Sequence, residues 1–214
     1  MKQKLAVGLL IVAGAVIVLV AVASVVVYFR VYAPVAPLLT LSGATNMEGR
    51  LSEKDFVEPA SDELIDAQVT KFAAVEREVE HSLGAQFEDV RAAYERLVPS
   101  NDADVRRVST RPALEAFGPV RIPFLGAKTV QVRAMNQASL SKREFEWVRQ
   151  RLYRAAGLRL RQVDFSDVAG DLRSGALRVT SDELRSAVPE RNFALTRPLV
   201  QELRRWIPLA FWGL

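Results

Sequence analysis

Hydrophobic residues follow two kinds of pattern along this chain. Leu5–Phe29 contains no charged side chain, which predicts a transmembrane helix of about 37 Å at 1.5 Å per residue. Further along, apolar residues either recur at three- and four-residue steps, as on one face of a helix, or alternate with polar ones, as in a strand. We therefore expect one N-terminal transmembrane helix followed by a single soluble domain.

The alternative to an uncleaved anchor is a signal peptide, because Ala21-Val22-Ala23 resembles a cleavage site. The apolar run continues beyond it and is longer than the hydrophobic part of a signal peptide, which favours the anchor. Lys2 and Lys4 precede the helix and favour a cytoplasmic N-terminus. We expect a single-pass protein of the bacterial inner (cytoplasmic) membrane with its domain in the periplasm.

The chain divides into four predicted parts. Residues 1–30 form the anchor, and residues 31–50, rich in proline and turn-forming residues, form a juxtamembrane linker. Residues 51–205 form the soluble domain, and residues 206–214 form an apolar, aromatic C-terminal tail.

Helical spacing is strongest in three segments of the domain. The first runs from Ser61, a possible N-cap, to Leu83, and the second covers residues 85–97. The third begins at Ser141, which forms a capping box with Glu144, and ends before Gly157. Shorter helices are predicted near Pro112, from Thr180 with Glu183 as a capping box, and from Thr196 through Leu199, Leu203 and Trp206.

Alternating residues predict short strands at 120–124, 129–133 and 158–165, although Pro123 interrupts the first. Together these elements predict an α-rich α+β domain. Without the strands, the alternative is an all-α domain.

Charge is distributed unevenly between the two halves of the domain. Residues 53–104 hold 14 acidic and 5 basic side chains, whereas residues 105–214 hold 20 basic and 10 acidic ones. The halves could pack together with ion pairs across their contact, or the basic half could face anionic lipid or an acidic partner.

Candidate chemistry is sparse. The chain has no cysteine and a single histidine, His81, which we expect on a helix surface. These counts exclude thiolate and multi-histidine metal sites, and we find no nucleophile, phosphate-loop, dinucleotide or haem-attachment motif. We therefore expect a non-enzymatic protein without a cofactor or metal.

Two segments are candidates for contact with a partner or membrane. The basic stretch 149–161 contributes Arg149, Arg151 and Arg154, although a solvated basic face is the simpler interpretation. The tail could fold into its own core, dock on a partner subunit or lie on the bilayer. The tail candidates are Trp206, Ile207, Leu209, Phe211, Trp212 and Leu214, and Tyr28 is expected at the membrane interface.

These features predict a non-enzymatic accessory or scaffold subunit that stabilises a larger membrane complex. Light-harvesting, respiratory, secretory and envelope-building machinery would all accept such a subunit. Its partners would be other subunits and the lipid bilayer, not nucleic acid. The alternative is a stand-alone, membrane-anchored envelope protein that binds a lipid, glycan or peptide in its domain.

Overall fold

The computed structural model describes residues 55–98, 105–181 and 187–214, together with Val20, Ser24, Met47, Gly49 and Leu51. The predicted anchor, the linker and Tyr28 lie outside this part of the chain apart from those isolated positions. No helix within the described residues is long and apolar enough to cross a bilayer.

Helices dominate the described part of the domain. They are α3 (Asp66–Leu83), α4 (Phe87–Leu97), α5 (Thr110–Phe117), α6 (Arg121–Gln137), α7 (Lys142–Ala155), α8 (Val168–Ser174), α9 (Glu190–Thr196) and α10 (Val200–Phe211), with short 3-10 turns η2 (Gly84–Gln86) and η3 (Arg197–Leu199). The strands β1 (Arg107–Ser109), β2 (Arg161–Val163) and β3 (Ala176–Ser181) form an antiparallel sheet in the order β1-β3-β2. The α-rich α+β prediction is confirmed, and the all-α alternative is wrong.

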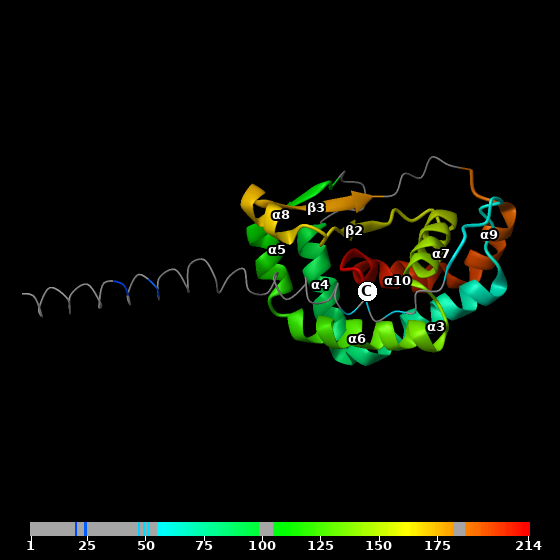
Figure 1. Ribbon diagram of the computed structural model, residues 1–214, viewed down its shortest axis with the longest axis horizontal. Coiled ribbons are helices and arrows are strands. Elements are labelled where there is room, and N and C mark those ends of the chain that lie inside the picture. Colours follow the sequence, from blue (N-terminus) through cyan, green and yellow to red (C-terminus); the bar gives the residue numbers. More distant parts are fainter. Residues whose placement is uncertain are drawn as a thin grey trace, which may run out of the picture.

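Helix α10 runs through the middle of the domain (Figure 1). The sheet lies on one side of it, with β2 against α10, and the long helices α3 and α6 pack together on the other side. Aromatic rings fill the space between these layers: Phe72 of α3 lies 5.0 Å from Phe145 and 6.4 Å from Trp206 between ring centroids. Such ring pairs add specific contacts to the burial of apolar area, so α10 is a central core element.

Both ends of α7 are as predicted. The Ser141 hydroxyl accepts a hydrogen bond from the Glu144 amide at 3.2 Å. Gly157 adopts a left-handed φ of 68°, and the Leu158 amide donates to the Tyr153 carbonyl at 2.9 Å. This is the hydrogen bond that closes a helix at a glycine.

Helix α3 begins later than predicted. Its first residue is Asp66 and its N-cap is Ile65, so Ser61 does not cap it. The Ile65 amide donates to the Gln68 side chain at 3.3 Å, which replaces the predicted cap. Asp62 has a φ of 58°, a conformation that breaks the helix and that aspartate tolerates better than most residues. His81 is exposed on the helix, as expected.

The strands predicted at 120–124 and 129–133 are wrong, because both segments lie in α6. Pro123 stands in the first turn of that helix, where its missing amide has no partner to lose. Phe124, Gln131 and Met135 lie on the buried face of α6. Packing of α6 along α3 has outweighed the local preference for strand, since β propensity depends strongly on context.

The strand predicted at 158–165 is confirmed at its centre, where β2 occupies Arg161–Val163. Thr180 does not cap a helix. It belongs to β3, where it pairs with Gln162 and donates its hydroxyl hydrogen to the Gln162 carbonyl at 3.2 Å. Glu183 lies outside the described residues.

The acidic and basic halves pack against each other. Ion pairs join Glu58, Asp62, Asp66, Glu78 and Glu80 of the first half to Arg143, Arg151, Arg154, Arg191, Arg133 and Arg205 of the second. The interpretation that charge asymmetry reflects internal pairing is therefore confirmed for these groups.

Candidate anion-binding site

The C-terminal tail is part of the domain core. Trp206 and Leu214 are 0% exposed, Trp212 is 1% exposed, Leu209 and Phe211 are also buried, and Ile207 is partly buried. The Trp206 indole donates to the Glu80 carboxylate at 2.7 Å, and the Leu214 amide donates to the Leu209 carbonyl at 2.9 Å. Of the three predicted alternatives, the structure shows the tail folded into its own core. The prediction that these side chains contact a partner or the bilayer is corrected, because they contact their own core.

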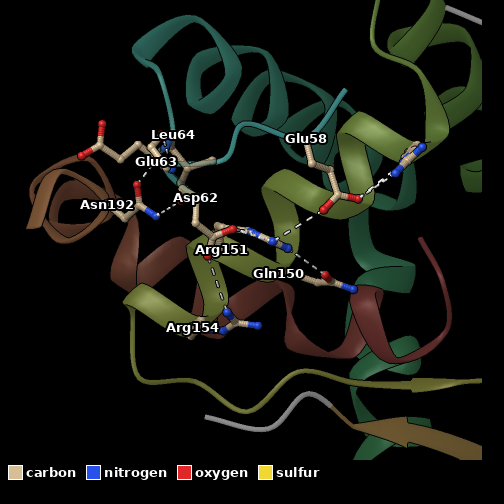
Figure 2. A network of polar contacts seen from close by, with 10 residues as sticks. Glu58, Asp62, Glu63, Leu64, Gln150, Arg151, Arg154 and Asn192 are labelled. Atoms are coloured by element: carbon tan, nitrogen blue, oxygen red, sulfur yellow. Dashed lines mark hydrogen bonds and ion pairs between the residues drawn. The ribbon is translucent and has the colours of Figure 1, made fainter. Parts of the chain in front are cut away.

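Arg151 and Arg154 form an internal network rather than a free basic surface (Figure 2). Two nitrogens of Arg151 donate to one oxygen of Asp62, at 2.6 and 2.8 Å, and Arg154 lies 3.8 Å from the other oxygen. The Arg151 guanidinium also stacks over the Trp147 ring, 4.8 Å from its centroid. The charges of both arginines are therefore paired inside the domain, and their contact with lipid or a partner stays a prediction.

A buried amide secures the same segment. The Asn192 side chain of α9 donates to the Asp62 carbonyl at 2.9 Å and accepts from the Leu64 amide at 2.8 Å (Figure 2). The residues before α3 are thus tied to both α7 and α9, and this cluster has a structural role.

Arg149, two residues before Arg151, has different surroundings. It is 2% exposed, so it offers no surface for lipid or an acidic protein, and that prediction is also corrected. Its terminal nitrogens donate to the Leu214 main-chain oxygen and to the Gln162 side-chain oxygen, each at 3.0 Å. In the described part of the chain its Nε has no hydrogen-bond partner, and no aspartate or glutamate side chain there pairs with it. A buried guanidinium with a spare donor is uncommon, since buried charges are normally paired.

A cavity of about 270 Å³ lies beside Arg149. It opens to solvent and is lined by residues of α6, α7, β2 and β3 and by those that follow α10. Its polar wall includes Lys128, Lys142, Arg149, Gln162, Ser166 and Thr180. Its apolar wall includes Phe124, Leu160, Val163, Phe165 and Trp212. The lining of the cavity combines cationic donors with aromatic and aliphatic side chains.

The two carboxylates of the wall each lie near a cation of their own. Glu146 is 3.9 Å from Lys142, and Asp164 is 3.7 Å from Arg178. Burial raises the pKa of Asp164, but hydrogen bonds from Ser166 and the charge of Arg178 outweigh it and lower that pKa overall. Asp164 is therefore ionised at neutral pH, and its charge is paired with that of Arg178. The lining beside Arg149 is therefore positively charged.

Lys128 reaches the cavity from α6. Its ammonium donates to the Gln131 side-chain oxygen at 2.9 Å and to the Gly213 carbonyl at 2.7 Å. These contacts hold a second buried cation against the same wall as Arg149.

No protein-family model, curated protein or solved structure matches this chain. The chemistry of the site must therefore be read from its geometry. Within the described ranges, no group of three or more histidine, cysteine, aspartate or glutamate side chains could hold a metal ion. The cavity instead offers what an anion needs, namely buried N–H donors with positive charge.

Glu76 of α3 lies in the core near these cations. It is 0% exposed, and neither carboxyl oxygen has a hydrogen-bond partner among the described residues. Burial raises its pKa to about 8, although Arg149 and Lys128 oppose that rise and Glu80 adds to it. The carboxyl is therefore mostly protonated at neutral pH, and it does not neutralise the two cations.

Sequence reasoning missed both Glu76 and Lys128. Glu76 stands four residues after Phe72 and three before Val79, on the apolar face of the helix. A charged residue in that stripe was the available signal. Lys128 stands four residues after Phe124 in the same way, but its signal was hidden by the incorrect strand predictions.

Proposed function

We propose that this domain binds a small anionic ligand in the cavity beside Arg149. The observation that carries the proposal is the buried Arg149 side chain, which lines the cavity and forms no ion pair with a carboxylate side chain of the described residues. Arg149 donates to the terminal oxygen of Leu214, and removing its guanidinium from water is costly, so an anion in the cavity would recover part of that cost.

Cavity size and lining favour a particular ligand class. About 270 Å³ lies slightly below the usual range for small-molecule pockets, which favours a ligand of roughly ten non-hydrogen atoms. Phe124, Phe165 and Trp212 add aromatic surface to the same lining as the cations. We therefore expect a carboxylate, sulfonate or phosphate head with a compact apolar flank.

This proposal develops the binding-protein alternative drawn from the sequence. The domain would be held at the bacterial inner membrane by Leu5–Phe29, would face the periplasm and would act without catalysis. In the accessory-subunit hypothesis the tail was one of the expected contacts with a partner, and the burial of Trp206, Trp212 and Leu214 argues against that contact.

Isothermal titration of the full chain in detergent at low salt provides the test. Benzenesulfonate is a suitable probe because it keeps one negative charge across the working pH range and carries an aromatic ring. Methyl phenyl sulfone, a neutral molecule of similar shape, is the ligand control. Saturable 1:1 binding of the anion but not of the sulfone supports the proposal, and equal binding of both or of neither overturns it.

A pair of neighbouring variants locates the site. Lys142 lines the cavity, whereas Arg143 is paired with Glu58 and does not line it. Lys142→Glu should weaken benzenesulfonate binding about tenfold, because it reverses a charge at the rim. Arg143→Glu, the same reversal one residue away, should change it less than about twofold. Equal losses in both variants would mean that the probe responds to overall charge and not to this cavity.

A further inference from the structure

Glu76 and the cavity share two cations. Arg149 and Lys128 line the cavity, and both interact electrostatically with Glu76. The cations stand on α7 and α6, and α3 packs against both of these helices. Any negative charge in the cavity and any negative charge on Glu76 therefore draw on the same positive groups.

The other ionisable groups around Glu76 do not take over this role. Glu80, on the same helix, binds the Trp206 indole and Arg205. Tyr153 of α7 is fully buried, and burial followed by the charge of Glu76 raises its pKa well above the ordinary value. The phenol thus stays neutral at any pH at which the protein is handled. Tyr94 of α4, which faces Tyr153, also has a pKa raised by burial.

We propose that ligand binding in this cavity is coupled to the protonation of Glu76, so that the pocket accepts its anion while the carboxyl is neutral and releases it when the carboxyl ionises. The inference rests on the proposed function and adds its regulation. It stands on the complete burial of Glu76, its two unpartnered oxygens and its position beside the cations of the pocket.

The direction follows from electrostatics. In a medium of low dielectric constant, two anions near one cationic pair repel each other more strongly than they would in water. Ionised Glu76 acts as the internal counter-ion and lowers the affinity for the ligand. By reciprocity, a bound anion makes ionisation of Glu76 harder and raises its pKa further. Near pH 8, where Glu76 of the empty protein is about half ionised, binding should be accompanied by uptake of a proton.

The coupling has two separate measurements in the full chain. Titration with benzenesulfonate at pH 7 and pH 9 should show an affinity that falls at least about fivefold at the higher pH. Titration near pH 8 in buffers of different ionisation enthalpy should show net uptake of about half a proton per ligand, because the buffer supplies that proton.

The matched variant is Glu76→Gln, which keeps the shape of the protonated carboxyl and cannot ionise. Its affinity should change less than about twofold between pH 7 and pH 9, and its binding should take up no proton. Thermal unfolding confirms that the variant is folded before titration.

Each outcome separates the two proposals. No anion binding at either pH, by wild type and Glu76→Gln alike, overturns the proposed function. Wild-type binding with equal affinity at both pH values and no proton uptake leaves the binding site in place and overturns the coupling. A Glu76→Gln variant that keeps the wild-type pH dependence also overturns it, because another group would then be titrating.

Discussion

Two arginines of α7, only two residues apart, have opposite electrostatic situations. Arg151 meets Asp62 and Glu58 and stacks on Trp147. Arg149 is more deeply buried and meets the Leu214 main-chain oxygen and the Gln162 side chain, with one N–H unused. Residues two apart on a helix point about 200° from each other. One face of α7 therefore forms ion pairs with the residues before α3, while the other borders a cavity.

The difference shows that a basic run in a sequence is not one surface. Charges on the Arg151 face are balanced within the domain and hold the residues before α3 in place. The charge of Arg149 is balanced by no carboxylate side chain in the described residues, and the nearby Glu76 is protonated at neutral pH. A binding site is expected where a charged side chain is buried without a carboxylate side chain beside it, and not where charged residues are densest in the sequence.

The largest effect on stability is expected from replacing Glu76 by a residue that cannot ionise. Its pKa is about 4.5 when unfolded and about 8 when folded, so between these values the folded protein binds the extra proton and stability falls as pH rises. The limiting slope is about 1.4 kcal/mol per pH unit. Glu76→Gln does not lose stability in this way. Its free energy of unfolding relative to wild type should therefore rise by about 3 kcal/mol between pH 4.5 and pH 7. Urea unfolding at the two pH values measures the gain.

A matched control is available for this change. Glu115 is exposed and pairs with Arg111 on the surface of α5, so Glu115→Gln should show no comparable gain with pH. If Glu76→Gln and wild type differ by the same amount at both pH values, Glu76 does not hold a proton at neutral pH.

A smaller effect on stability is expected from replacing Arg151, on the face of α7 that pairs with Asp62. Arg151 is 14% exposed, and Arg151→Met would leave Asp62 without its main partner, at a cost of about 2 kcal/mol. Benzenesulfonate affinity should stay within about twofold, because Arg151 does not line the cavity. Urea unfolding and titration of the same preparation report the two quantities. A strong loss of affinity with unchanged stability would reverse the roles assigned to the two faces.

The smallest effect on stability is expected from breaking an exposed ion pair. Arg77 donates to Glu202 and lowers its pKa, so this pair contributes stability above the ordinary glutamate pKa and loses that contribution as pH falls through the lowered value. Water screens the pair, so Glu202→Gln should cost at most about 0.5 kcal/mol at pH 7 and nothing in strong acid. Thermal unfolding at both pH values measures the cost. A loss as large as that of Arg151→Met would show that exposure does not separate these pairs.

Prediction from the sequence succeeded where the signals were local. The N-cap at Ser141 and the stop at Gly157 depend on neighbouring residues, and both ends of α7 were predicted from them. Of the predicted capping box, the structure shows the hydrogen bond from the Glu144 amide to Ser141, while the Glu144 side chain accepts from Gln68. Helix α6 was missed because its choice between helix and strand depends on packing against α3, about fifty residues away in the chain.

The site was harder to predict than the fold. Arg149 was selected for the density of positive charge around it, although its role depends on its burial and on its place in the lining of the cavity. Whether Trp206 and Trp212 face a membrane or a core depends on the space that α3, α4 and the sheet leave for α10. The charged residue in the apolar stripe of α3, Glu76, was the sequence signal closest to the site.

The most direct test of the binding site is a crystal structure of the full chain soaked in selenate, located by the anomalous scattering of selenium. Selenate carries two negative charges and fits the cavity by size. The account predicts a selenium atom within hydrogen-bonding reach of Arg149 and Lys128, in the cavity bordered by Trp212. Selenium found only at exposed arginines such as Arg143, or in no ordered position, would contradict it.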